Sequence, residues 1–265
     1  MRSFDEHHLL SDSNDVMTVS CLSVLGDREE QQDSFCYYLK PQSGMVAICD
    51  GMGGHEGGRQ ASGLAAESFE FGFENLGPNE APDQFMMDTA LACDEMISSL
   101  KNKDGERLKA GSTCVALTIQ NKELFWCSVG DSRAYLLRGN EFVQLTQDQN
   151  YHSVLQAKLE TGLITEEEYR SQTTQGEALI SYLGIGNLSL IDYNSAPLPL
   201  VSGDVIVMMS DGLYRLLSDD EIKRVVENFS NHEDALYALD AKAGSAAKRH
   251  DVSRDNMTVA IISIK

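Results

Sequence analysis

The fold of this chain is decided by residues 205–212, which read Val-Ile-Val-Met-Met-Ser-Asp-Gly. Five apolar residues follow one another without interruption, and such a run is typical of a strand that is buried on both faces. A polar Ser-Asp-Gly then ends the strand. Residues 46–51, Val-Ala-Ile-Cys-Asp-Gly, have the same layout early in the chain. Strands of this kind need a layer of structure on each side, and that need sets the architecture.

The remaining apolar runs predict two packed sheets. Short apolar runs predict strands, and apolar residues at three-and-four spacing predict helices. The expected strands cover 16–25, 34–39, 45–49, 112–119, 124–129, 134–137, 142–145, 188–191, 205–209 and 258–264, and the expected helices cover 59–76, 82–100, 219–229 and 233–248. Turn residues join consecutive strands, which implies antiparallel pairing. We therefore expect an α+β fold, a four-layer α-β-β-α sandwich of two antiparallel sheets flanked by helix pairs.

Length and composition favour one domain. The chain has 265 residues, of which 42% are hydrophobic, and no Gly/Ser/Pro-rich linker divides it. Residues 1–15 are polar, so we expect a loose leader there and a single domain over residues 16–265. Residues 150–180 are also polar and are expected to be helical in part.

Charge and cysteine usage exclude several classes of protein. There are 41 acidic residues and 21 basic ones, which gives a net charge of −20. Nucleic acid and anionic membranes bind Lys/Arg-rich faces, so neither is an expected partner. No apolar run approaches the ~20 residues that span a bilayer, and the N-terminus lacks a signal-peptide profile. The six cysteines include no Cys-x-x-Cys pair, so we interpret them as buried reduced thiols of a cytoplasmic protein, with zinc or disulfide use as the alternative.

Three aspartates stand at the edges of apolar strands, namely Asp50, Asp211 and Asp255. An Asp-Gly pair is commonly a hairpin turn, but no returning strand follows Asp50 or Asp211. Carboxylates that converge on one rim of a sandwich repel one another, and a divalent cation removes the repulsion. Oxygen ligands without His or Cys select Mg2+ or Mn2+. Two such ions can activate a water and hold a phosphoryl group.

Arg28 is the candidate partner for an anion, because a guanidinium can grip phosphate through two N–H groups. A solvated surface arginine is the alternative interpretation.

The glycine-rich stretch 51–59 does not fit a nucleotide loop. Arg59 and Gln60 stand where a Walker loop needs Lys and then Ser or Thr, and Glu56 replaces the third glycine of the dinucleotide pattern. We interpret the glycines there as positions that let the backbone pass close to metal ions.

The motifs in their order resemble the metal-dependent protein phosphatases of type 2C, and most closely their short bacterial single-domain members. The resemblance spans residues 28–259. Its motifs are Arg28-x-x-x-Gln32-Asp33, Asp50-Gly51-Met52-Gly53-Gly54-His55, Gly111-Ser112-Thr113, Gly130-Asp131-Ser132-Arg133-Ala134, Leu145-Thr146-x-Asp148, Gly203-Asp204, Ser210-Asp211-Gly212-Leu213 and Asp255-Asn256-Met257-Thr258-Val259.

This resemblance implies hydrolysis of phosphoserine and phosphothreonine by a water that bridges two Mn2+ or Mg2+ ions. It implies that the metal ligands are Asp50, Asp211, Asp255 and the backbone carbonyl of Gly51. It also implies that Asp131, together with Asp211, holds a more weakly bound third ion.

The resemblance assigns further roles around the metal ions. Asp33 is expected to hold a metal-bound water, and Arg28 to bind the substrate phosphate. Thr113 and Asn256 are expected to support the ligands from behind. A flap near the site is expected at about residues 150–183. The expected partners are phosphorylated proteins that a Ser/Thr kinase has modified, and the chain is expected to act as a monomer.

Two positions depart from the family pattern. Eukaryotic members carry a histidine, proposed as general acid, where Met52 stands, and His55 is the nearest titratable candidate in sequence. Many members carry an acidic residue where Arg215 stands, which weakens the expectation of a third metal. The alternative function is a non-catalytic binding protein of the same fold. Its signature would be the loss of a ligand aspartate, and all three aspartates are present.

Overall fold

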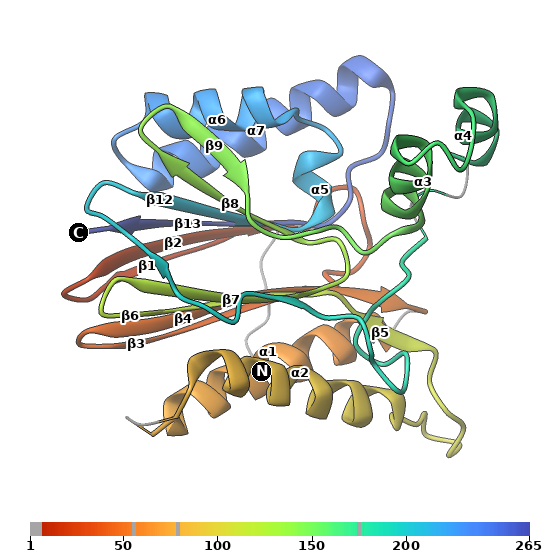
Figure 1. Cartoon of the computed structure of the whole chain (residues 1–265), viewed down its shortest axis with the longest axis horizontal. Helices are drawn as coiled ribbons and strands as arrows, with labels where there is room; N and C mark the ends of the chain where they lie inside the picture. The colour runs from red at the N-terminus through yellow and green to blue at the C-terminus, as the bar shows by residue number, and fades with distance from the viewer. Residues whose placement is uncertain (1–6, 55–56, 78–79, 174–175, 177) are drawn as a thin grey trace.

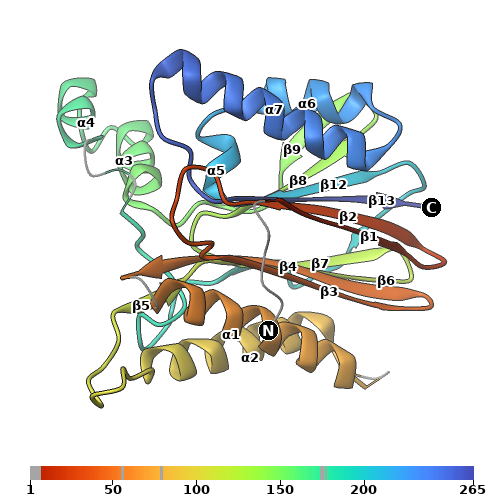
Figure 2. The ribbon, with the colours of Figure 1, turned by 180° about the vertical axis from the view of Figure 1, so that it is seen from behind.

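The computed structural model describes residues 7–54, 57–77, 80–173, 176 and 178–265. Two sheets lie face to face, and a pair of helices covers the outer face of each (Figure 1). The view from behind shows the same four layers, with the two helix pairs on opposite sides of the molecule (Figure 2). The predicted α-β-β-α sandwich is therefore confirmed.

The first sheet is six-stranded and antiparallel throughout. Its central strand pair joins the last strand of the chain to the apolar run that defines the fold. In spatial order the strands are β1 (His7–Ser13), β2 (Met17–Val24), β13 (Met257–Ile264), β12 (Val205–Met209), β8 (Arg133–Arg138) and β9 (Glu141–Gln144).

The second sheet is seven-stranded, and its pairs are also antiparallel. The main path runs through β10 (Asp192–Tyr193), β7 (Glu123–Val129), β6 (Cys114–Gln120), β4 (Ser43–Gly53) and β3 (Asp33–Lys40). Off this path, β11 (Leu198–Pro199) pairs with β7, and β5 (Ala110–Ser112) pairs with the end of β4.

Apolar side chains fill each of the three spaces between the four layers. Residues such as Ile48 and Ile206 pack between the two sheets. A second cluster lies between the seven-stranded sheet and the helices α1 (Gly57–Asn75) and α2 (Pro82–Ser98). A third lies between the six-stranded sheet and the helices α6 (Asp219–Asn228) and α7 (His232–His250). The strands of both sheets are therefore covered on both faces, as the apolar runs require.

The polar N-terminal segment is not loose over residues 7–13, which contradicts the expected leader. These residues form β1, which pairs with β2 over seven positions and stands at the edge of its sheet. Edge strands commonly carry polar and charged side chains, which discourage pairing with the strand of another chain. Composition alone therefore mistook an edge strand for an unstructured leader.

The expected strand over residues 188–191 is also wrong, because this segment is a loop. The carboxylate of Asp94 on α2 accepts the backbone N–H groups of Gly184, Gly186 and Leu188 at 2.8–3.0 Å. Directly before the expected strand, Gly184 and Gly186 turn the chain with φ values of +96° and +77°, and Leu188, its first residue, is held in the same loop. A contact with a distant helix thus overrides the local apolar pattern.

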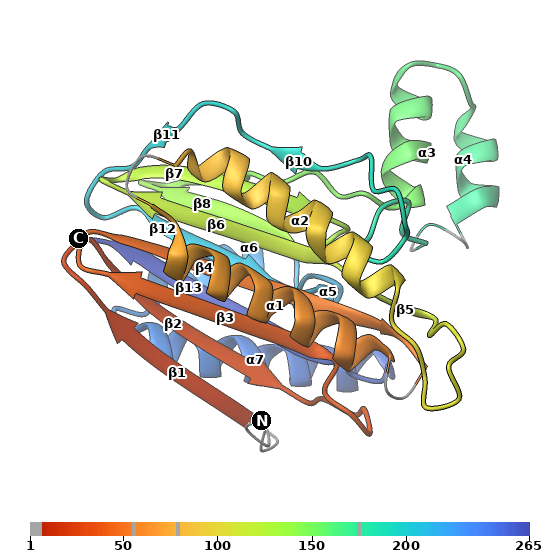
Figure 3. The same ribbon diagram turned by 90° about the horizontal axis from the view of Figure 1, so that it is seen from below.

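One end of the sandwich carries the features that matter for function. The short helix α5 (Asp211–Tyr214) begins there, directly after β12. Beyond the same end stand α3 (Tyr151–Glu160) and α4 (Glu166–Gln172), within the segment expected to form the flap (Figure 3). No helix in the described part of the chain is long and apolar enough to cross a membrane.

Candidate active site

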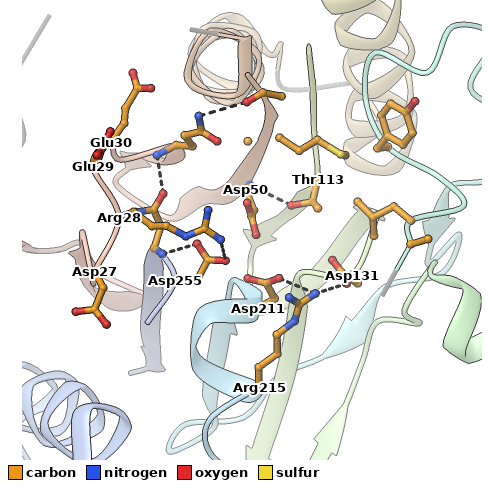
Figure 4. Close-up of a pocket in the computed structure, with 18 residues that line it drawn as sticks. Asp27, Arg28, Glu29, Glu30, Asp50, Thr113, Asp131, Asp211, Arg215 and Asp255 are labelled. Carbon is orange, nitrogen blue, oxygen red and sulfur yellow. Dashed lines mark hydrogen bonds and ion pairs between the residues drawn. The ribbon is translucent and has the colours of Figure 1, made fainter. Parts of the chain in front are cut away.

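A cavity of about 800 Å3 opens at this end of the sandwich. Six of the seven residues predicted for the site line it, namely Arg28, Asp50, Gly51, Asp131, Asp211 and Asp255 (Figure 4). They come from loops and strand ends that are far apart in the sequence. The seventh, Asp33, does not line this cavity; it is buried on β3, where it pairs in register with Asp50 of β4.

Asp50 is fixed by a break in the strand next to it. The predicted strand over residues 112–119 is interrupted at Thr113, between β5 and β6. The Thr113 hydroxyl accepts the Asp50 N–H at 3.0 Å, and the Thr113 N–H donates to the Asp50 carbonyl at 2.8 Å. Ser132 shares a hydrogen bond of 2.7 Å with the same hydroxyl. Thr113 therefore fixes the backbone of Asp50 through two hydrogen bonds.

Each Asp-Gly pair marks a close backbone contact and not a hairpin. A Cβ atom on Gly51 would lie 2.2 Å from the carbonyl oxygen of Gly58, and one on Gly212 would lie 2.0 Å from that of Asn256. Only glycine fits at either position, and each glycine follows a cavity aspartate. The hairpin interpretation of these pairs is wrong.

Asp211 and Asp131 face the same cation, although they come from different elements. Asp211 is the first residue of α5, and Asp131 lies in the turn between β7 and β8. The Arg215 guanidinium nitrogen Nη2 lies 2.9 Å from Oδ2 of Asp211 and 4.0 Å from Oδ2 of Asp131. Arg215 therefore compensates part of the charge of this pair.

Asp255 and Arg28 form the opposite side of the cavity. Nη2 of Arg28 donates to Oδ2 of Asp255 at 2.5 Å. The next residue, Asn256, ties the loop down, because its side-chain oxygen accepts the Gln32 N–H at 2.9 Å and its amide donates to the Leu25 carbonyl at 2.8 Å. Arg28 thus lies at the rim of the cavity, with a side chain that is 57% exposed.

Asp33 is buried opposite Asp50 in the strand pair β3–β4, and one of its carboxylate oxygens has a hydrogen-bond partner. Ser210 donates its hydroxyl to Oδ2 of Asp33 at 2.8 Å. Its other oxygen, Oδ1, is buried without a hydrogen-bond partner among the described residues. Burial raises the pKa of Asp33 to about 7, and the charges of Asp211 and Asp255 add to the rise. Buried carboxylate oxygens normally accept a hydrogen bond, and the described residues offer Oδ1 no donor. A bound water molecule would supply one.

The carboxylates of the cavity resist ionisation. Burial raises the pKa of Asp50 well above its ordinary value, and Asp33 and Asp211 raise it further. Burial likewise raises the pKa of Asp211 to about 6, with Asp131 adding to the rise and Arg215 opposing it. Burial is also the main reason that the pKa of Asp131 is raised. Like charges crowded in this way favour the binding of a cation.

The donor set fits hard divalent ions that keep part of their water. In the described part of the chain, no three His, Cys, Asp or Glu side chains gather around one point as a closed cage would require. Mg2+ is usually held by one or two carboxylates plus waters, so an open set of carboxylates suits it. Zn2+ would favour His or Cys ligands, and among the described residues the cavity lining contains neither.

Several cavity residues carry no motif and were missed by the sequence analysis. The acidic residues Asp27, Glu29 and Glu30 flank Arg28 at the rim, and Ala178, Leu179 and Tyr182 close the side that follows α4. Nothing in their spacing pointed to the site. Met52 lines the cavity, whereas His55 lies outside the described residues.

Comparison with known proteins decides the family. The family model described as protein phosphatase 2C matches residues 11–154, which is more than half of the chain. The chain belongs to the protein phosphatase 2C family. The predicted family is thereby confirmed, and with it the enzyme class: the chain is a metal-dependent phosphoprotein phosphatase.

The similarity extends over nearly the whole chain. This phosphatase 2C is 28% identical to the protein phosphatase PhpP of Streptococcus pneumoniae over 253 residues, covering 94% of this chain and 98% of the relative. Its structure resembles the serine/threonine phosphatase of S. agalactiae, with a TM-score of 0.81 and 25% identity over 94% of this chain and all of the other. It also resembles the catalytic domain of the phosphatase PstP in complex with two manganese ions, with a TM-score of 0.74 and 24% identity over 94% of this chain and 98% of the other.

Proposed function

We propose that this chain hydrolyses phosphoserine and phosphothreonine in proteins with two Mn2+ or Mg2+ ions held in the acidic cavity. The observation that carries the proposal is the meeting of Asp50, Asp131, Asp211 and Asp255 on one cavity beside Arg28. Four carboxylates alone would repel a phosphate dianion. Divalent cations reverse the sign of the local field, and the cavity then attracts the substrate.

In this proposal Asp50, Asp211, Asp255 and the Gly51 carbonyl hold the two ions. When bound, the ions supply an activated water and neutralise charge on the phosphoryl group. Asp33 would accept a hydrogen bond from water at this centre through Oδ1, since Ser210 already donates to its other oxygen.

Arg28 is proposed to bind the substrate phosphate. Its side chain is 57% exposed, so it reaches the solvent side of the cavity, where a substrate enters. An ion at Asp255 would share that carboxylate and weaken its hold on Arg28. The freed guanidinium can then grip phosphate through two N–H groups. The arginine thus positions the phosphoryl group and does not activate the water.

The proposal extends to the partners and the place of action. The substrates are proteins phosphorylated by a Ser/Thr kinase, and residues 150–183 serve as the flap beside the cavity. The active unit is proposed to be a monomer. All six cysteines are free and buried, which suits the reducing cytoplasm.

Metal removal and a ligand substitution test the proposal together. The wild-type chain should release phosphate from a phosphothreonine peptide with Mn2+ or Mg2+, and lose this activity in chelator. Asp255→Asn should be inactive with metal, while Asp234→Asn, which removes one exposed charge on α7, should match wild type. Circular dichroism checks that each variant is folded. Full activity in chelator would contradict the metal centre, and a folded wild type without turnover would favour the binding-protein alternative.

A further inference from the structure

Arg215 occupies a position in the cavity that a metal ion could otherwise take. It lies one helical turn after Asp211, and its guanidinium reaches both Asp211 and Asp131, at 2.9 and 4.0 Å (Figure 4). The Asp131 side chain is only 4% exposed and that of Asp211 12%. A positive charge is therefore held between two shielded carboxylates, on the side of the cavity away from Arg28.

We propose that Arg215 is a built-in cation that takes the place of a divalent ion between Asp131 and Asp211, and so limits the cavity to two ions. The inference rests on the proposed function, because it concerns the same cavity. It makes Arg215 a positioning residue, which acts by holding Asp211 and by closing one ligand pair to metal.

The chemistry of the guanidinium supports this role. Arginine stays protonated in proteins and is more weakly hydrated than an ammonium group, so it tolerates a shielded site. Its covalent tether keeps it at high effective concentration beside the two carboxylates. A divalent ion, by contrast, must shed water to enter and must displace the arginine first. Weakly bound ions are therefore the ones that Arg215 excludes.

The nearest other arginine does not compete for this role. Arg133 lies two residues after Asp131, but its guanidinium is bound by Asp148 at 2.7 Å and stacks 3.7 Å above the Tyr214 ring. Asn150 donates an amide N–H to Asp131 at 3.4 Å and brings no charge. Of the described side chains, Arg215 is thus the cation placed to neutralise the Asp131–Asp211 pair.

Counting bound Mn2+ by equilibrium dialysis of the metal-free protein tests the inference without measuring activity. Arg215→Met keeps an unbranched stem but removes the guanidinium group and its charge, so it should bind one more Mn2+ per chain than wild type. Arg215→Lys should keep the wild-type count. The double variant Arg215→Met/Asp131→Asn should lose the added ion. The Arg215 side chain is 38% exposed, so these variants should fold, and Arg215→Gln offers a second neutral replacement.

An unchanged ion count in folded Arg215→Met and Arg215→Gln would overturn the inference. So would a wild-type chain that already binds an ion which Asp131→Asn removes. Failure of the proposed function looks different, because a folded wild-type chain would then bind no Mn2+ or would leave phosphopeptide intact in its presence.

Discussion

The two ends of strand β12 carry aspartates in opposite electrostatic situations. Asp204 precedes the strand and Asp211 follows it. Asp204 receives Nε and Nη2 of Arg138 at 2.9 and 2.6 Å and the Val201 N–H at 2.8 Å. Although burial acts to raise it, these hydrogen bonds hold the pKa of Asp204 below its ordinary value. At the other end, burial and neighbouring carboxylates hold the pKa of Asp211 above it.

Burial therefore does not separate structural from functional carboxylates in this molecule. Asp94 is buried as deeply as Asp33, yet three backbone N–H groups satisfy Asp94, while one oxygen of Asp33 is left without a partner among the described residues. What differs is the supply of donors from the fold itself. A buried carboxylate that the fold leaves unsatisfied needs a ligand from solution.

The largest expected difference between the two ends is in turnover. Asp211→Asn removes a proposed ligand charge and should lower kcat by at least about a thousandfold, since metal ions supply several kcal/mol of transition-state stabilisation. Asp204→Asn should leave kcat within about twofold, because the residue lies at the far end of β12. Steady-state rates on a phosphothreonine peptide measure both. If both folded variants lost kcat equally, the position of an aspartate at the cavity would not explain its effect on turnover.

The two arginines that pair with aspartates give the next contrast. Arg28→Ala should raise KM about 10- to 100-fold with little change in Tm, because Arg28 is exposed and its proposed partner is the substrate. Arg138→Ala should keep KM and lower the free energy of unfolding by about 1–3 kcal/mol, because it strips hydrogen bonds from the buried Asp204. Kinetics and urea unfolding of both variants decide the matter. Loss of kcat with unchanged KM in Arg28→Ala would contradict a phosphate-binding role.

The pH dependence of stability should run in opposite directions at the two ends. A carboxyl group whose pKa is raised by folding binds more protons in the folded state, so its contribution to stability falls as pH rises. Asp33 and Asp211, with pKa values of about 7 and about 6, should therefore destabilise the metal-free protein progressively between about pH 4 and pH 7. The pKa of Asp204 is lowered, so its contribution is present above about pH 4 and is lost in acid.

Urea unfolding of metal-free protein across this range tests the sign. Asp33→Asn should flatten the decline between pH 4 and pH 7, and Mn2+ should oppose it, because the ion binds the deprotonated carboxylates. Asp204→Asn should leave that window unchanged and alter only the acid limb. If the free energy of unfolding of the metal-free wild type rose from about pH 4 to pH 7, the raised pKa values of Asp33 and Asp211 would be contradicted.

The sequence predicted those features that depend on local pattern. The range of β12 is confirmed at both ends, because an apolar run buried on both faces needs no knowledge of its neighbours. The aspartates at the strand ends were found by the same pattern, since each directly follows or shortly precedes such a run. The family motifs then indicated which other residues join them.

What the sequence could not predict depends on contacts between distant segments. Asp94, some 90 residues earlier, fixes the loop at residues 184–188, and the strand predicted over residues 188–191, which begins at Leu188, does not form. The edge strand β1 is polar and gave no apolar signal. The rim acids beside Arg28 carry no periodicity, and only the fold shows that they line the cavity. The position of Arg215 between two carboxylates was likewise invisible until the fold was known.

The smallest expected effect concerns Asp94, the satisfied counterpart of Asp33. Oδ1 of Asp94 accepts two N–H groups and Oδ2 accepts the third, so an asparagine keeps one acceptor oxygen and turns an amide N–H2 toward a backbone donor. Asp94→Asn should lower the free energy of unfolding by about 1–3 kcal/mol, the cost of leaving a buried group unsatisfied. Turnover should change less than about threefold, because none of the residues 184–188, the loop that Asp94 holds, lines the cavity. Urea unfolding and phosphopeptide kinetics at saturating Mn2+ measure the two effects separately.

A different outcome would contradict the comparison between Asp94 and Asp33. If folded Asp94→Asn lost turnover as completely as Asp211→Asn, a carboxylate with all its hydrogen bonds made by the fold would be as necessary for catalysis as one without them. The number of hydrogen bonds that an aspartate receives from the fold would then not distinguish functional from structural aspartates.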